Sequence, residues 1–259
     1  MAHPVILIHS SGMSSRQWSR LVEAFGPDFS VVAPDLLGSG SNPLWPDDAP
    51  FDLGLDVQVL ERRIDELGGR VHLAGHSYGG LLALTIARRK PSRVASLAVY
   101  DPVAFGVIHD AEDEAGLRDL QRLGRSSIFN DWALGGSDPW FEAFIDYWNG
   151  PGAWRAMSEA GRQSFLRVGR KVFYEVWSLG HDRTPRSAYR VVDAPTLLLS
   201  GGASEVAARR VVELLAPAMP RAELRFIEGA GHMGPLTHAR AVNEAIVRIP
   251  LKREEIADY

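Results

Sequence analysis

The sequence predicts an α/β fold: a mostly parallel sheet of about six strands, flanked by helices, with a helical cap insertion. Short apolar runs alternate with helical patterns up to about residue 102, and again from about residue 192. The stretch between these regions contains no convincing strand pattern. A chain of 259 residues, with 46% hydrophobic and 23% charged side chains, is typical of one large domain with its own core.

The first hundred residues predict the first part of the sheet. The expected elements, in order, are a strand at 4–9, a helix at 16–25, a strand at 29–33, a Pro- and Asp-rich loop at 42–51, a helix at 53–67, a strand at 71–75, a helix at 78–89 and a strand at 94–100. Strands that alternate with helices are joined by right-handed crossovers, so we expect them to pair in parallel.

The strand pattern stops after Asp101 and resumes only near residue 195. The intervening stretch holds five of the seven tryptophans, which predicts a helical cap. We therefore predict an α/β core made of residues 1–102 and 192–259, and a cap made of residues 103–191. After the cap we expect a strand at 195–199, a helix at 207–215, a strand at 223–227 and a helix at 239–249.

Composition excludes several classes of function. A net charge of −4 and the absence of a basic cluster argue against a nucleic-acid partner. Without cysteine there is no disulfide, no thiolate metal site and no cysteine nucleophile. The first residues lack a charged leader, and no apolar run reaches membrane-spanning length, so we expect a cytoplasmic protein that does not contact a membrane.

The motif with the clearest chemistry is GHSYG at residues 75–79. In a chain of this composition the pattern G-x-S-x-G arises by chance roughly 0.2 times, so its surroundings decide its value. Here a buried-strand pattern precedes it and a helical pattern follows it. The glycines two residues before and two residues after Ser77 allow a sharp strand-to-helix turn that exposes the Ser77 hydroxyl to a base. We predict that Ser77 is a nucleophile.

A base and an oxyanion hole are expected at fixed places around this turn. His232 follows the last predicted strand in a glycine-rich stretch, and the order serine, acid, histidine suits this kind of turn. One oxyanion N–H should come from Tyr78, at the start of the helix after the nucleophile. We expect the second from Ser11, in the Ser- and Gly-containing loop after the first strand.

Together these motifs resemble the α/β-hydrolase fold family. The similarity covers nearly the whole chain: the HSSG loop at 9–12, PDLLGSGS at 34–41, the GHSYG turn and GAGHM at 229–233. The resemblance implies a serine esterase that needs neither a metal nor an organic cofactor. Family members usually begin with a β-hairpin before the oxyanion strand. This sequence begins at that strand, so we expect a sheet about two strands smaller.

The acid of the triad is where the sequence departs from the family. Relatives often carry an aspartate after the strand at 195–199, and Ser204 takes that position here. Some relatives, including haloalkane dehalogenases, place the acid one strand earlier, which corresponds to Asp101. We favour Asp101 over Glu205. A simple turn aspartate before Pro102 is the competing interpretation. Asp35 resembles a structural aspartate of the family.

The predicted reaction is hydrolysis of an ester-type bond through an acyl-enzyme. The expected substrate is a small, partly apolar molecule, and a homodimer is possible. A hydroxynitrile lyase is an alternative, because those enzymes also carry a hydroxyl residue after the first histidine. They normally have lysine after the catalytic histidine, where this chain has Met233. A non-catalytic binding protein is a second alternative. The side chains predicted to bind substrate are Ser10, Trp132, Trp140, Phe144 and Trp148.

Overall fold

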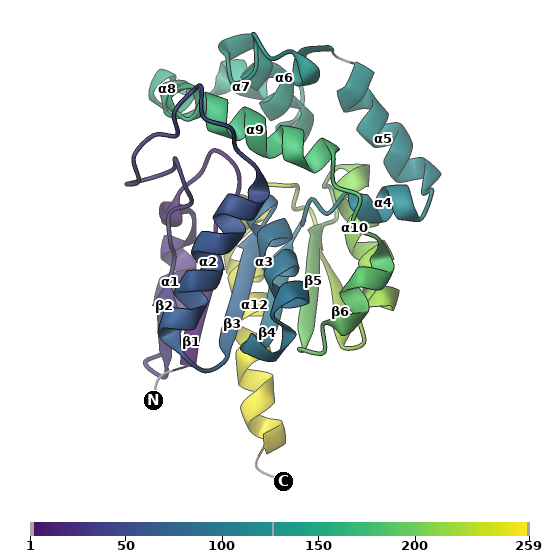
Figure 1. Ribbon diagram of the computed structural model, residues 1–259. Coiled ribbons are helices and arrows are strands. Elements are labelled where there is room, and N and C mark those ends of the chain that lie inside the picture. Colours follow the sequence, from purple (N-terminus) through teal and green to yellow (C-terminus); the bar gives the residue numbers. More distant parts are fainter. Residues whose placement is uncertain (1–2, 126, 258–259) are drawn as a thin grey trace.

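A computed structural model describes residues 3–125 and 127–257 of the chain (Figure 1). Six strands form one sheet in the order β2-β1-β3-β4-β5-β6, and every neighbouring pair is parallel. The strands are β1 (His3–Ile8), β2 (Phe29–Val32), β3 (Val71–His76), β4 (Val94–Tyr100), β5 (Thr196–Gly201) and β6 (Ala222–Ile227). The predicted six-stranded α/β fold is therefore confirmed.

Helices cover both faces of the sheet, as parallel strands require. On one face lie α2 (Leu53–Leu67), α3 (Tyr78–Arg89) and α10 (Val206–Leu215); on the other lie α1 (Ser19–Ala24) and α12 (Ala239–Ala257). Successive side chains of a strand point to opposite faces. Accordingly, Ile6 and Ile8 join the cluster under α2 and α3, whereas Val5 and Leu7 join the cluster under α1 and α12.

The described residues between β4 and β5 contain helices and no strand. They are α4 (Gly106–Asp110), α5 (Glu114–Arg125), η3 (Ser127–Asn130), α6 (Asp138–Asn149), α7 (Ala153–Ala156), α8 (Glu159–Arg167), α9 (Gly169–Gly180) and η4 (Arg186–Val191). Figure 1 shows α5 to α9 above one end of the sheet. Several of them share a largely aromatic cluster of their own. The division into domains at residues 102 and 191 stays a prediction.

Most predicted elements match the observed ones, and the differences lie at the ends. The predicted helix at 16–25 is split into η1 (Ser15–Trp18) and α1. The last helix continues past the predicted end at 249, through Pro250, to Ala257. The remaining elements are η2 (Pro91–Arg93), η5 (Ala216–Ala218) and α11 (Gly234–Thr237).

Within the described part of the chain, no helix combines the length and apolar character that a membrane span needs. The cytoplasmic location and the possible homodimer stay predictions.

Candidate active site

Ser77 occupies the sharp turn between β3 and α3. Its φ of 55° is in the left-handed region, which is unusual for a residue with a side chain. Two glycines make this turn possible. A Cβ on Gly75 would lie 2.3 Å from the carbonyl oxygen of Gly79, and a Cβ on Gly79 would lie 2.3 Å from that of Ile8. The backbone therefore holds the Ser77 side chain at the carboxyl end of the sheet.

The structure brings Ser77, His232 and Asp101 into one chain of hydrogen bonds. The Nε2 atom of His232 lies 3.0 Å from Ser77 Oγ, and its Nδ1 atom lies 3.1 Å from Asp101 Oδ2. A carboxylate only accepts, so Nδ1 carries the proton of the neutral ring and Nε2 is the acceptor for the Ser77 hydroxyl. All three side chains are buried. This tautomer suits removal of a proton from Ser77.

Asp101 follows β4 and is held by more than the histidine. Its φ is 43°, a second left-handed residue at the site. The hydroxyl of Ser200 donates to Oδ1 at 2.5 Å, and that of Ser204 donates to Oδ2 at 2.6 Å. Ser204, at the position where relatives often carry the acid, thus hydrogen-bonds to the carboxylate that faces His232. These donors compensate the burial of the Asp101 carboxylate.

Glu205, the alternative acid, faces a different partner. Glu205 lies at the amino end of α10, and its carboxylate is 3.6 Å from the Arg122 guanidinium. Burial, and then the nearby Asp119 carboxylate, raise the pKa of Glu205. Among the described residues, no hydrogen bond joins Glu205 to His232. Of the two candidate acids, the geometry brings only Asp101 to the imidazole.

A further histidine, His76, fixes the backbone of His232. Its Nε2–H donates to the carbonyl oxygen of His232 at 2.8 Å. Burial, and then the neighbouring His232 ring, lower the pKa of His76 well below 6.5, so this ring stays neutral. This contact was not predicted from the sequence. Adjacency to Ser77 was the only available signal, because the partner lies 156 residues away.

The two expected oxyanion donors are at the start of α3 and in the loop after β1. Tyr78 is the first residue of α3, so its N–H has no acceptor inside the helix. Ser10 is already engaged, because its N–H and its hydroxyl both donate to Oε1 of Gln17, at 3.1 and 3.0 Å. For the N–H of Ser11, no partner is found among the residues that the structure describes. Ser11 also lines the same cavity as Ser77.

A largely apolar cavity of about 560 Å³ opens at Ser77 and His232. Trp148 forms part of its wall and stacks on the His232 ring, with ring centres 3.8 Å apart and planes inclined by 20°. The indole therefore shields one face of the imidazole from water. The other lining side chains include Ser10, Met13, Phe144, Ile145, Met157, Phe165, Met233 and Leu236.

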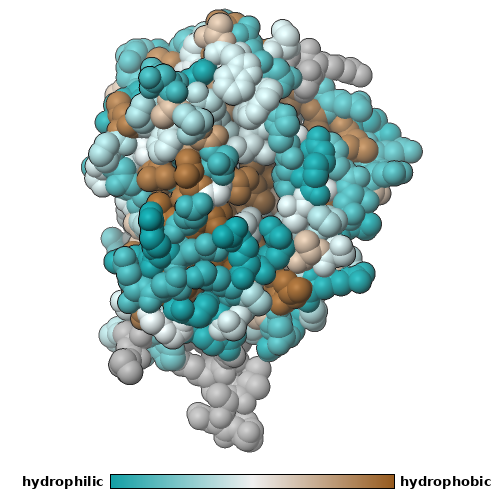
Figure 2. All heavy atoms as spheres, in the orientation of Figure 1, coloured by the Kyte–Doolittle hydropathy of each residue, from teal (hydrophilic) through white to brown (hydrophobic). Residues whose placement is uncertain are grey.

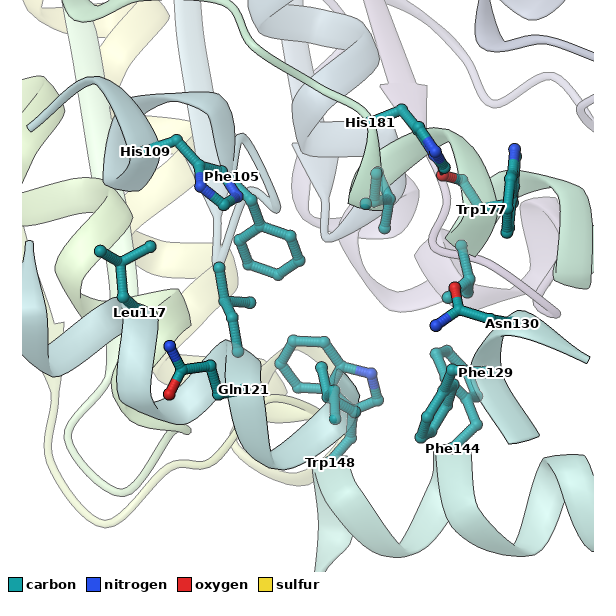
Figure 3. Close-up of a pocket in the computed structure, with 15 residues that line it drawn as sticks. Phe105, His109, Leu117, Gln121, Phe129, Asn130, Phe144, Trp148, Trp177 and His181 are labelled. Atoms are coloured by element: carbon teal, nitrogen blue, oxygen red, sulfur yellow. Dashed lines mark hydrogen bonds between the residues drawn. The ribbon is translucent and has the colours of Figure 1, made fainter. Parts of the chain in front are cut away.

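A second cavity of about 420 Å³ adjoins the first, and Phe144 and Trp148 line both. Figure 3 shows the rings of Phe105, Phe129 and Trp148 around this space, with polar side chains farther out. On the face drawn in Figure 2, apolar side chains gather in a hollow between the cap and the sheet layer, within a hydrophilic surround. The polar lining residues are His109, Gln121, Asn130 and His181.

Two of the tryptophans predicted to bind substrate, Trp132 and Trp140, lie outside both cavities. Trp140 is fully buried in the cap and stacks on Phe144, with ring centres 5.1 Å apart. Because Trp140 and Trp148 are eight residues apart on α6, they lie about 12 Å apart along the helix, and only the carboxyl-terminal half reaches the cavities. Trp132 is 47% exposed and packs against Trp177. Neither Trp132 nor Trp140 lines either cavity.

The described residues contain no group of three or more His, Cys, Asp or Glu side chains that could hold a metal ion.

Comparisons with known proteins agree with this fold. The model of the alpha/beta hydrolase family matches residues 5–245. The chain is 38% identical to lipase LipV of Mycobacterium tuberculosis over 99 residues, which are 38% of this chain and 36% of the lipase. The aligned part thus spans little more than a third of that relative.

Two solved structures superpose on nearly the whole chain. An alpha/beta hydrolase from Sphaerobacter thermophilus gives a TM-score of 0.71 at 22% identity, over 96% of this chain and 92% of the other. A meta-cleavage product hydrolase from Pseudomonas fluorescens gives 0.72 at 19% identity, over 97% and 92%. At these identities the structures show the fold alone. Since the family model matches residues 5–245, the chain belongs to the alpha/beta hydrolase family.

Proposed function

We propose that the protein is a serine hydrolase that cleaves a carboxylic ester or similar acyl bond through an acyl-enzyme. One observation carries the proposal: Ser77, His232 and Asp101 are joined at 3.0 and 3.1 Å beside an apolar cavity. A hydroxyl paired with a neutral imidazole, itself oriented by a carboxylate, is the arrangement that activates serine for acyl transfer. The lipase relative supports the same class of reaction.

The first half-reaction forms the acyl-enzyme. Ser77 Oγ attacks the ester carbonyl carbon while His232 Nε2 takes the hydroxyl proton. Asp101 stabilises the resulting imidazolium, and the N–H groups of Ser11 and Tyr78 donate to the oxyanion. When the tetrahedral intermediate collapses, the carbon–oxygen bond to the leaving group breaks. His232 then gives its proton to the departing alcohol.

The second half-reaction releases the acid. Water attacks the acyl-enzyme carbonyl, and His232 Nε2 takes a proton from that water. Collapse of the second tetrahedral intermediate breaks the bond to Ser77 Oγ, which recovers its proton from His232. The sum is one ester and one water converted to one acid and one alcohol.

The substrate we propose is a small ester with at least one apolar group. The cavity at Ser77 is lined mainly by methionine, phenylalanine, leucine and tryptophan side chains, which favour an alkyl or aryl group. The adjoining cavity adds further aromatic surface behind Phe144 and Trp148. Besides Ser77 and His232, the polar side chains that line this cavity and could orient a substrate are Ser10, Ser11, Asn149 and Thr237.

Hydrolysis of nitrophenyl esters with acyl chains of two to ten carbons tests this proposal. We expect wild type to hydrolyse some of them, and Ser77→Ala to lose about 10³-fold or more in kcat. Ser19→Ala is the matched control, because the exposed Ser19 hydroxyl bonds only to the nearby Arg16 carbonyl. A fluorophosphonate should label wild type and Ser19→Ala and leave Ser77→Ala unlabelled.

Three results would contradict the proposal. Full activity in Ser77→Ala would exclude this nucleophile. Cyanide release from a cyanohydrin, without ester hydrolysis, would favour the lyase alternative. Neither turnover nor labelling of wild type would favour the binding-protein alternative.

A further inference from the structure

A buried ionic cluster joins the cap to the core beside the candidate oxyanion site. Lys171 lies on cap helix α9, and its Nζ donates to Asp56 Oδ2 of α2 at 2.8 Å. It also donates to Glu175, one turn further along α9. The three side chains are at most 2% exposed. Buried charges are costly to maintain, so three of them between cap and core call for a reason beyond packing.

Asp56 holds the residue that supplies one candidate oxyanion donor. The hydroxyl of Tyr78 donates to Asp56 Oδ2 at 3.1 Å. Burial, and then the nearby Asp56 charge, raise the pKa of Tyr78 well above 10, so the hydroxyl keeps the proton that it donates. The N–H of Leu37 donates to the other oxygen, Oδ1, at 3.0 Å. Hydrogen bonds to both carboxylate oxygens therefore hold Asp56 in place. One of these bonds also holds Tyr78, the first residue of α3.

Glu175 lies near Ser11, the other candidate donor, although its Oε2 atom has no hydrogen-bond partner among the described residues. The side chain of Ser11 lies beside Glu175 and favours its ionised form. Burial acts in the opposite direction and raises the pKa of Glu175. Lys171 lies between the two carboxylates, with its Nζ 5.3 Å from the centre of the Tyr78 ring. Hydrogen bonds thus link Lys171 to Tyr78 through Asp56, and Lys171 also binds Glu175, the carboxylate near Ser11.

We propose that Lys171, Asp56 and Glu175 are positioning residues, through which the cap sets the Ser11 and Tyr78 N–H groups for catalysis. The inference rests on the proposed hydrolase function and concerns the same site. Oxyanion donors act only when they point at the place where charge develops, so small displacements reduce kcat. Lys171 also balances two buried carboxylates close to where a negative oxyanion would form.

The first test removes one contact and keeps everything else. Tyr78→Phe deletes the hydroxyl bonded to Asp56 and leaves the ring and the backbone N–H. The matched control is Tyr147→Phe, because Tyr147 donates to Asp119, likewise at 3.1 Å, and lines neither cavity. We expect kcat for a nitrophenyl ester to fall about tenfold in Tyr78→Phe, with KM within about twofold. The control should retain the wild-type kcat.

The second test removes the ion pair. Lys171→Met should lower kcat more than Tyr78→Phe does, because it leaves two buried carboxylates unbalanced. Arg210→Met is its control: Arg210 of α10 pairs with Asp113, between α4 and α5, at 2.6 Å, and this ion pair does not involve Ser11 or Tyr78. If Lys171→Met does not fold, the neutral triple variant Asp56→Asn, Lys171→Met, Glu175→Gln replaces it. This variant should fold and still show the kcat loss.

The outcomes separate this inference from the proposed function. An active wild type, with kcat unchanged in Tyr78→Phe and in the Lys171 or triple variant, would overturn the positioning cluster alone. A loss in Arg210→Met or Tyr147→Phe equal to that in the test variants would also overturn it, because the effect would then be general. A wild type that neither turns over esters nor is labelled at Ser77 would overturn the proposed function, and this inference with it.

Discussion

The sheet layer and the cap contribute to the candidate site in different ways. The sheet layer supplies Ser77, Asp101 and His232 from loops that follow β3, β4 and β6. Since all six strands are parallel, these loops meet at one end of the sheet. The cap supplies Trp148 from the last turn of α6 and Lys171 from the first turn of α9. Strand ends place the first group, whereas helix packing places the second.

This difference divides the expected effects of mutation. Groups at strand ends would touch the reacting atoms, so their loss should reduce catalysis by orders of magnitude. Cap side chains shape the cavity and hold other groups in position, so their loss should cost less and alter selectivity more. Four predictions test this division, in order of decreasing effect.

The largest effect is expected at the acid. Asp101→Asn should keep the hydrogen-bonding shape but lose the charge that supports the imidazolium, and so lower kcat by about 10³- to 10⁴-fold. Glu205→Gln is the control and should stay within about twofold of wild type, because its carboxylate faces Arg122. Steady-state kinetics on a nitrophenyl ester measures both. A severe loss in Glu205→Gln with a mild one in Asp101→Asn would move the acid to Glu205.

A smaller effect is expected in the cap. Trp148→Ala should remove the wall shared by the two cavities and uncover His232, lowering kcat for short esters about tenfold. The ratio of kcat/KM for a ten-carbon ester to that for an acetate should rise about tenfold. Trp132→Ala removes an exposed cap tryptophan outside both cavities and should change neither quantity. Equal effects of the two variants would contradict the placement of the substrate.

The folding stability of the sheet layer should also decrease at acidic pH. Burial lowers the pKa of His9 to about 4, whereas the unfolded ring titrates near 6.5. Between these values the unfolded chain binds a proton that the folded chain does not. The ring's contribution to stability is therefore complete above pH 6.5, and falls by about 1.4 kcal/mol per unit as the pH drops toward 4. In the fold, His9 Nε2 accepts from the Leu36 N–H at 3.0 Å.

Urea unfolding of wild type and His9→Asn between pH 7 and 4.5 measures this contribution. The variant should gain stability relative to wild type as the pH falls. Ser19→Ala, which removes no titratable group, should keep a constant difference from wild type. A constant difference for His9→Asn would contradict the prediction.

The smallest effect is expected at Asp35, which accepts from the N–H groups of Ser15 and Ser41 at 2.7 and 2.8 Å. Burial alone would raise the pKa of Asp35, but these hydrogen bonds lower it to about 2. Asp35→Asn should therefore cost about 1 kcal/mol at pH 7, with little change in kcat. The contribution exists above pH 3.8 and is lost as the pH falls toward 2. The exposed Asp48→Asn is the control in urea unfolding at pH 7 and pH 3.

The central strands β3, β4 and β5 could be predicted closely because they are buried on both faces. Such strands are continuous apolar runs bounded by turn residues, and β4 was predicted at its observed bounds. Ser77, His232 and Asp101 could be proposed for a related reason. Ser77 and Asp101 directly follow β3 and β4, and His232 lies in the loop after β6. Local sequence and strand order therefore suffice to place all three at the same sheet edge. Their catalytic roles stay predictions.

Contacts between cap and core could not be predicted in this way. Lys171 and Asp56 are 115 residues apart, and nothing in the local sequence of either indicates the other. The positions of Trp132 and Trp140 outside both cavities could not be predicted for the same reason. Aromatic composition indicates a packed cap, but which ring faces the cavity depends on the rotation and depth of each helix. Of the four aromatic residues predicted to bind substrate, Phe144 and Trp148 line the cavities and the other two do not.

The position of Asp101 has a consequence for recombining such proteins. Only residues 102–105 separate it from α4, so the strand end that presents the carboxylate to His232 is also the cap's point of attachment. At the other end of the cap, near η4, the attachment point does not adjoin Ser77, His232 or Asp101 in the sequence. In a chimera that borrows a cap from a relative, the first crossover should therefore fall after Pro102. The second can be shifted along the residues between η4 and β5 with far less consequence.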